Sequence, residues 1–184
     1  MQRTIANLNG RSQVQAFEAA KAIWKDSDPR LERPLILLLK KGRRPFNRAA
    51  AAFAMQTVRT LKTIAALERT LSDKSEYPRL RGEAAEALAH AHRKKSHHVL
   101  LKNLTDRSKE VRFWCAFALG EMAERRAIAE LTRLSLTDKR VVRGFHSVAK
   151  EAADVLENIR SEKKAHRTKG GCVFCCSRNR DASQ

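Results

Sequence analysis

A pattern of the form Arg-x-x-x-Ala-x-Ala-Leu recurs along this chain and constrains its fold more than any other feature. It begins at Arg81 and again at Arg112, 31 residues later, and Arg143 stands a further 31 residues on. Arg48, which lies 33 residues before Arg81, begins the same pattern with Met55 in place of the leucine. A period of about 30 to 35 residues is typical of a solenoid, in which each repeat buries its apolar face against the next.

The residues around this pattern resemble the HEAT repeat, in the short variety named after the phycobilin lyases. The resemblance is close over residues 78–159 and looser over residues 12–73. It implies a fold and a way of presenting surface, but it does not imply a reaction, because one scaffold hosts many functions. The matching residues are Asp106, Val111, Arg112, Ala116, Ala118, Leu119, Gly120, Ala127, Ile128, Leu131, Asp138, Val142 and Arg143.

The composition favours closely packed helices. The chain is 42% hydrophobic but only 5% aromatic, and its 7 glycines and 4 prolines are too few for a turn-rich all-β protein. We therefore predict an all-α protein, a right-handed α-solenoid of four to five HEAT-like helical hairpins over residues 11–160. Residues 1–10 are expected to be flexible, and residues 161–184 to form a basic, cysteine-containing, disordered tail.

Two local questions stay open at this stage. The break between the helices expected at residues 46–58 and 61–71 is weak, so one long helix is the alternative. Residues 141–146 form either a longer loop or an extra turn, because the last helix is displaced by several residues against the period.

The recurring arginines are expected to form a structural ladder. In the resembled family the Arg and an Asp a few residues ahead of it hydrogen-bond within and between repeats. Periodic recurrence is what stacking requires, so this role is favoured over ligand binding. The ladder residues are Arg48, Arg81, Asp106, Arg112, Asp138 and Arg143, and Asp73 precedes Arg81 in the same way.

A second set of basic residues is not required by the repeat. The chain has 38 Lys and Arg against 20 Asp and Glu, a net charge of +18. Such a charge favours a polyanionic partner, and the alternative is solvated loop charge. Stacking should gather the connectors between pairs on one rim, with Lys40, Lys41, Arg43, Arg44, Lys74, Arg79, Arg107, Lys109, Lys139 and Arg140. The turns within pairs should form the other rim, with Arg59, Lys62, Arg93, Lys94, Lys95, Arg125 and Arg126.

Enzymatic chemistry is not favoured, although the sequence does not exclude it. We find no phosphate-binding glycine loop and no Gly-x-Ser-x-Gly nucleophile motif. No histidine is followed by glutamate, so the paired His-Glu ligands of the deoxyhypusine hydroxylases, which are built on similar repeats, are absent. We expect no cofactor, with the exception of a zinc site in the tail.

That zinc site would use thiolates, which are capable zinc ligands. Adjacent Cys175 and Cys176 fit one tetrahedral site poorly, and a redox-sensitive or acylated cluster and an unstructured reactive tail are the alternatives. The four residues are His166, Cys172, Cys175 and Cys176.

We interpret the chain as a cytoplasmic, non-enzymatic scaffold or adaptor that binds an acidic protein partner, or a larger complex, through its groove. The first residues lack a secretory signal, and the longest apolar runs, at residues 35–39 and 49–55, are too short for a transmembrane segment. The alternative is a nucleic-acid-binding solenoid whose basic rims contact phosphates. An accessory factor like the phycobilin lyase subunits is a third hypothesis, and it depends on the repeat type alone.

Overall fold

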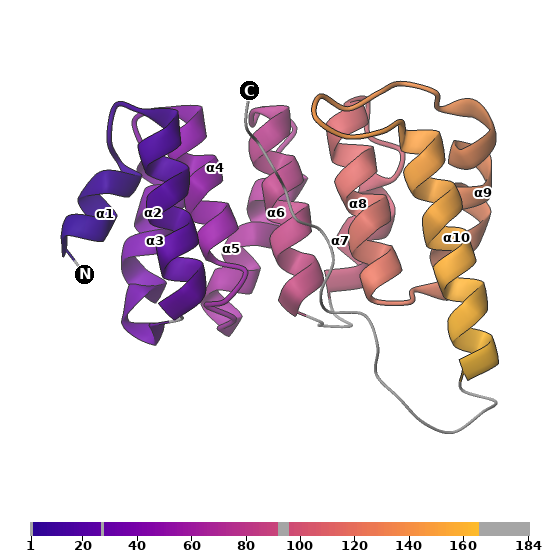
Figure 1. Cartoon of the computed structure of the whole chain (residues 1–184), viewed down its shortest axis with the longest axis horizontal. Helices are drawn as coiled ribbons and strands as arrows, with labels where there is room; N and C mark the ends of the chain where they lie inside the picture. The colour runs from indigo at the N-terminus through magenta and orange to yellow at the C-terminus, as the bar shows by residue number, and fades with distance from the viewer. Residues whose placement is uncertain (1, 27, 92–95, 166–184) are drawn as a thin grey trace.

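The computed structural model describes residues 2–26, 28–91 and 96–165, and these form a row of antiparallel helical pairs (Figure 1). The first four helices are α1 (Gln2–Leu8), α2 (Gln13–Asp26), α3 (Glu32–Lys41) and α4 (Pro45–Ala54). Then come α5 (Leu61–Ser72), α6 (Pro78–Ala91) and α7 (His97–Asn103). The last are α8 (Lys109–Glu121), α9 (Ile128–Thr137) and α10 (Val148–Ala165), with short 3-10 turns η1 (Pro29–Leu31) before α3 and η3 (Arg125–Ala127) before α9.

The helices lie in two layers, as Figure 1 shows along its long axis. In the first layer α4 packs between α2 and α6, and α8 packs between α6 and α10. The second layer holds α3, α5, α7 and α9. Each packs on the first-layer helix that follows it in the chain, and in chain order each is the second helix of a hairpin. The described residues therefore form four hairpins closed by α10, which packs on both α8 and α9. The predicted all-α solenoid is confirmed.

Small residues allow the first-layer helices to approach closely. In α4 the run Ala49–Ala52 is fully buried. A Cβ atom on Gly82 of α6 would lie 2.6 Å from Cδ1 of Trp114 on α8, and one on Gly120 of α8 would lie 2.7 Å from a methyl group of Val155 on α10. The two glycines therefore set the spacing of three successive first-layer helices.

The second pair consists of two separate helices. Thr60 caps α5, because its hydroxyl accepts a hydrogen bond from the backbone N–H of Thr63 at 3.2 Å while the Thr63 hydroxyl accepts one from the Thr60 N–H at 3.0 Å. This capping box satisfies backbone donors that a continuous helix would not expose. The alternative of one long helix over residues 46–71 is wrong.

The prediction that residues 1–10 are flexible is also wrong. They contain α1, which packs on α2 and α4 and buries Leu8 completely. The amide Nδ2 of buried Asn47 donates hydrogen bonds to the carbonyls of Leu8 at 2.7 Å and Gly10 at 3.0 Å. The open end of a stack exposes apolar surface unless something covers it, and α1 covers part of the N-terminal end.

At the other end α10 continues to Ala165, five residues into the segment expected to be a disordered tail. The sequence Glu-Lys-Lys-Ala at its end consists of good helix formers, which accounts for the extension. Residues 166–184 lie outside the described residues.

The segment between α9 and α10 is a loop that crosses over the N-terminal end of α8 (Figure 1). Phe145 places its ring 5.4 Å from that of Phe113 and 5.0 Å from that of Trp114, centroid to centroid. Val141 and Ser147 form an isolated antiparallel bridge at the base of the loop. Of the two alternatives for this segment, the longer loop is present.

None of the helices in the described residues is both long enough and apolar enough to cross a membrane.

Candidate functional site

Arg81 shows how a recurring arginine connects two repeats. Its Nε donates a hydrogen bond to the carbonyl of Leu71 in the preceding helix at 3.0 Å. Its Nη2 donates to Oδ1 of Asn103 at 3.0 Å, at the end of α7, and to Oδ2 of Asp106 at 2.6 Å, in the connector before α8. The guanidinium is thus held on both sides by groups far from it in sequence.

Arg112 makes the equivalent contacts one repeat later. Its Nε donates to Oδ2 of Asp138 at 2.7 Å, and its Nη1 donates to the backbone carbonyl of Asp106. Each aspartate also holds its own connector. Asp106 Oδ1 accepts from the backbone N–H of Ser108 at 2.9 Å, and Asp138 Oδ1 accepts from Nε of Arg140 at 2.7 Å.

These contacts keep both aspartates ionised. Burial alone would raise the pKa of Asp106, but hydrogen bonds from Arg81 and Lys74 hold it well below the usual range of a carboxyl. Burial would likewise raise the pKa of Asp138, but hydrogen bonds from Arg140 and Arg112 lower it. The two carboxylates are therefore permanent counter-ions of the stack at neutral pH.

The contacts of Arg48 differ from this pattern. Its Nε donates to the carbonyl of Leu39 at 2.6 Å, but its Nη2 pairs with Glu76 instead of Asp73. Asp73 accepts from the backbone N–H of Ser75 at 2.9 Å. Asp73 precedes its repeat arginine by eight residues, whereas Asp106 precedes Arg112 by six, so two extra residues change which acid reaches Arg48.

Arg143, expected to be the fourth arginine of the ladder, does not join it. It lies exposed in the loop before α10, and its side chain has no ion pair or hydrogen bond within the part of the chain that the structure describes. The loop that packs Phe145 on α8 takes this position out of the helical register. The periodicity of the sequence therefore predicts one ladder arginine, Arg143, that the described structure does not place in the ladder.

A cavity of about 500 Å³ opens beside the irregular contact of Arg48. It lies on the connector edge, between the N-terminal ends of α4, α6 and α8. The sequence analysis did not place Glu76, Tyr77 or Ser108 in a site. The one sequence signal for them is that Asp73 precedes the repeat arginine by eight residues where the next repeat has six. The lining residues are Pro45, Arg48, Lys74, Ser75, Glu76, Tyr77, Pro78, Arg81, Arg107 and Ser108.

The cationic side chains at this cavity differ in how many bonds they form within the chain and in how exposed they are. Arg81 is buried and bonded through all three of its nitrogens. Lys74 donates to Asn103 Oδ1 at 2.7 Å and pairs with Asp106, yet its side chain is 53% exposed. Arg107 is exposed and forms no ion pair among the described residues. The cavity therefore has a buried cationic floor at Arg81 and an exposed cationic margin at Lys74 and Arg107.

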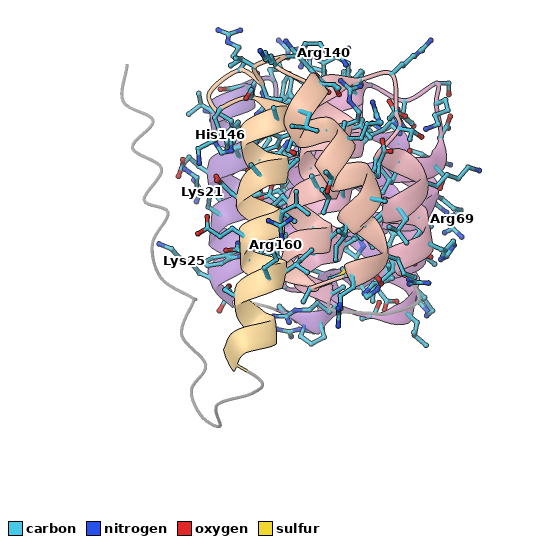
Figure 2. The ribbon with its side chains drawn as sticks, turned by 90° about the vertical axis from the view of Figure 1, so that its right-hand side faces the viewer. Lys21, Lys25, Arg69, Arg140, His146 and Arg160 are labelled. Atoms are coloured by element: carbon cyan, nitrogen blue, oxygen red, sulfur yellow. The ribbon has the colours of Figure 1, made fainter. Side chains whose placement is uncertain are left out.

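Antiparallel pairs place all connectors on one edge and all turns on the opposite edge. On the connector edge Lys40, Lys41, Arg43 and Arg44 follow one another at the end of α3, and all four are exposed. The Arg44 guanidinium lies 6.0 Å from the ring centroid of Phe46, and Arg140 pairs with Asp138. Lys139 is exposed beside Arg140, which Figure 2 labels at the upper edge.

On the turn edge the basic residues are more often paired with acids. Lys62 lies 3.3 Å from Glu32, and Arg126 lies 2.8 Å from Glu124. Arg59 and Arg125 are exposed without an ion pair in the described residues. The expected Arg93, Lys94 and Lys95 lie outside the described residues.

The turn edge also has polar links between repeats that sequence reasoning missed. Ser96 donates from Oγ to Glu68 of the preceding pair at 2.7 Å, and buried His97 pairs with Glu124 of the following pair. The hydrogen bond from Arg126 lowers the pKa of Glu124 to about 2, and the bond to His97 adds to the effect. These acids hold repeats together and are not free for a ligand.

A metal centre is not evident in the described ranges. They contain no group of three or more His, Cys, Asp or Glu side chains placed to hold a metal. The expected ligands His166, Cys172, Cys175 and Cys176 lie outside them. Cys115 is a free thiol on the core face of α8, and burial raises its pKa, so it is unreactive as a nucleophile.

Comparison with known proteins agrees with this geometry. A family model of HEAT repeats matches residues 71–145. The complex of CpcE and CpcF of phycocyanin lyase from Nostoc sp. PCC7120 is similar in structure, with a TM-score of 0.63 and 21% identity over 88% of this chain. This chain spans 65% of the length of that one. No curated protein matches the sequence.

Human deoxyhypusine hydroxylase in complex with glycerol is also similar, with a TM-score of 0.51 and 19% identity, over 84% of this chain and 72% of the hydroxylase. At these identities the likenesses show the fold alone. The stacked hairpins and their Arg–Asp links define the class of the protein as an α-solenoid. Within it, residues 71–145 match the HEAT-repeat family model.

Proposed function

We propose that this chain is a non-enzymatic scaffold or adaptor that binds an acidic protein partner along its connector edge. The observation that carries this proposal is the division of its cations into two groups. Arg48, Arg81 and Arg112 are held inside the fold by carbonyls and carboxylates. The second group is exposed and forms no ion pair in the described residues. It comprises Lys40, Lys41, Arg43, Arg44, Arg107, Lys109 and Lys139.

Exposed cations without internal partners favour anions that come from outside. Four of them lie within five positions at the end of α3 and directly after it, where like charges repel and an anionic partner relieves that repulsion. Of the described acids on this edge, Asp106, Asp138 and Glu76 are bonded to arginines, and Asp73 accepts a hydrogen bond from Ser75. Glu110, in the first turn of α8, is a further acid of the edge. The exposed cations of the edge therefore outnumber the acids that could compete with an external anion.

A protein partner is favoured over nucleic acid by the distribution of the unpaired charge. The two edges are separated by the length of a first-layer helix such as α6, whose 14 residues rise about 20 Å. A phosphate backbone that crosses the stack would use both edges, yet Lys62 and Arg126 on the turn edge are paired with acids. The similar CpcE–CpcF structure is a complex of two proteins, which supports protein binding as a use of this fold.

The proposal is tested by measuring binding of the purified, nuclease-treated protein to polyglutamate, to a generic DNA duplex and to a generic RNA, each across a salt series. We expect polyglutamate to bind at physiological ionic strength of about 0.15 M and to weaken as salt rises. Stronger binding of either nucleic acid, with a steep salt dependence, would favour the alternative in which both basic rims contact phosphates. Absence of polyglutamate binding contradicts the proposal. The cytoplasmic location stays a prediction.

A further inference from the structure

The cavity beside Arg48 has a composition that differs from the rest of the connector edge. It combines the floor of Arg48 and Arg81 with the exposed side chain of Tyr77 and the rings of Pro45 and Pro78. An arginine floor binds the head of an anionic side chain, and aromatic and proline rings pack on the aliphatic stem behind it. The cavity thus has the two kinds of wall that a carboxylate side chain needs.

Several donors at the cavity have no acceptor in the described residues. Arg48 uses Nε and Nη2, which leaves both N–H groups of Nη1. Lys74 donates to two acceptors, Asn103 and Asp106, with the three protons of its ammonium group, and the Arg107 side chain has no acceptor in the described residues. An incoming anion can therefore be bonded without breaking the Arg81–Asp106 link.

Glu76 indicates which anion fits. Its carboxylate already pairs with Arg48 from within the chain, and both side chains are about four-fifths buried. A carboxylate is thus accommodated at this position without disturbing the ladder. Because Glu76 belongs to the connector and not to a helix, it is also an internal competitor for any external carboxylate.

The local charge favours a singly charged group. The cations Arg48, Lys74, Arg81 and Arg107 stand against the carboxylates of Asp73, Glu76 and Asp106, which leaves an excess of one positive charge. A carboxylate neutralises that excess, whereas a phosphate monoester would add a second negative charge near three carboxylates.

We propose that the cavity beside Arg48 receives a single Asp or Glu side chain of the acidic partner, with Arg107 and Lys74 closing on its carboxylate and Glu76 competing for the same cations. This inference rests on the proposed function and locates its anchoring point. It predicts that a short acidic peptide binds here, and that one internal acid limits its affinity.

The test uses the single tyrosine of the chain, Tyr77, as a local probe. The full chain labelled with 3-fluorotyrosine gives one ¹⁹F signal at the cavity. It is titrated with acetylated and amidated tetraglutamate, which extends to at most about 14 Å and so cannot reach both edges. Tetraglutamine of the same form is the uncharged control. We expect a saturable shift with tetraglutamate alone.

Three variants then assign the binding to the cavity. Arg107→Glu should raise the Kd for tetraglutamate about tenfold, since it removes one attractive charge and adds a repulsive one. Arg125→Glu is the matched control, because Arg125 is an exposed arginine without an ion pair on the opposite edge, and it should change the Kd less than twofold. Glu76→Gln should lower the Kd about threefold to fivefold by removing the competitor.

The outcomes separate the inference from the proposed function. If polyglutamate binds but tetraglutamate leaves the ¹⁹F signal unmoved, or Arg107→Glu and Arg125→Glu weaken binding equally, the cavity is not the anchor and the scaffold proposal survives. If polyglutamate itself does not bind, both fail. A phosphoserine peptide that binds more tightly than tetraglutamate, and depends on Arg107, would overturn the argument from charge. A circular dichroism spectrum unchanged from the parent protein is required of each variant.

Discussion

Arg81 and Asp106 stand 25 positions apart and form a two-point ion pair, with Nη2 2.6 Å from Oδ2 and Nη1 3.3 Å from Oδ1. Their side chains are 2% and 1% exposed. The pair joins α6 to the connector that precedes α8, so it links one repeat to the next. A buried charge is tolerated only when it is paired, so each member of the link requires the other.

Asp106→Ala should therefore lower the free energy of unfolding by about 3–5 kcal/mol, because it leaves Arg81 buried without its counter-ion. Urea unfolding followed by circular dichroism measures this change. The control is Glu130→Ala, which breaks the more exposed pair with Arg133 and should cost less than about 1 kcal/mol. Equal effects of the two substitutions would mean that burial does not strengthen the requirement for a partner.

Stability should fall in acid. The pKa values of Asp106, Asp138 and Glu124 are all lowered in the folded state, that of Glu124 to about 2. A lowered pKa contributes stability that is complete above the unfolded value, near pH 4, and is lost as the pH falls through the folded value. We expect the free energy of unfolding to decline from about pH 5 toward pH 2.

Glu124→Gln should remove part of this decline, since the substituted side chain no longer titrates. The measurement is the free energy of unfolding from urea curves at a series of pH values. A variant curve parallel to that of the parent protein from pH 5 to pH 2 would show that Glu124 contributes nothing to acid sensitivity.

Gly82→Ala should destabilise the protein by about 1–3 kcal/mol, because the added methyl group meets the ring of Trp114 at 2.6 Å. The gain of up to about 1 kcal/mol in helix propensity does not compensate, since Phe113, Phe117 and Phe145 surround that ring. Trp114→Leu in the same chain should reduce the cost of Gly82→Ala. Additive effects in this double-mutant cycle would contradict the steric explanation.

Phe145→Ala should cost about 2 kcal/mol or more, because the side chain holds the loop before α10 on Phe113 and Trp114. Val141→Ala in the same loop is the control, since Val141 is exposed and the change should cost less than about 0.5 kcal/mol. Thermal unfolding of both variants distinguishes a packed loop from a mobile one, which would tolerate both changes equally.

Leu8→Ala should destabilise the protein by about 2–5 kcal/mol, the range for truncating a fully buried leucine. A flexible N-terminus would be indifferent to the change. Val14→Ala, at an exposed position of α2, should have almost no effect and serves as the control. Protection of the backbone amides of α1 in hydrogen exchange gives an independent measurement.

Some contacts followed from the period of the sequence, and others did not. Arg81 stands eight residues after Asp73, and Arg112 stands six residues after Asp106. Each lies in the first helix of a regular hairpin. Its bonded aspartate, Asp106 or Asp138, lies in the connector to the next hairpin, as stacking requires. Arg143 keeps the period but lies in a loop, because the aromatic contacts of Phe145 outweigh helical continuation there. A spacing cannot show whether the intervening residues are helical.

By itself, the sequence determined the class of fold and the order of the hairpins, because a helical repeat buries its apolar face against neighbours adjacent in the chain. Only the tertiary structure decided which acid pairs with Arg48, that α1 covers the N-terminal end, and where the cavity lies. The cavity is built by Pro45 at the start of α4 and by Tyr77 and Arg107 in the next two connectors, which meet at one edge only when the hairpins stack. Such a site depends on the distances between repeats, which no local pattern specifies.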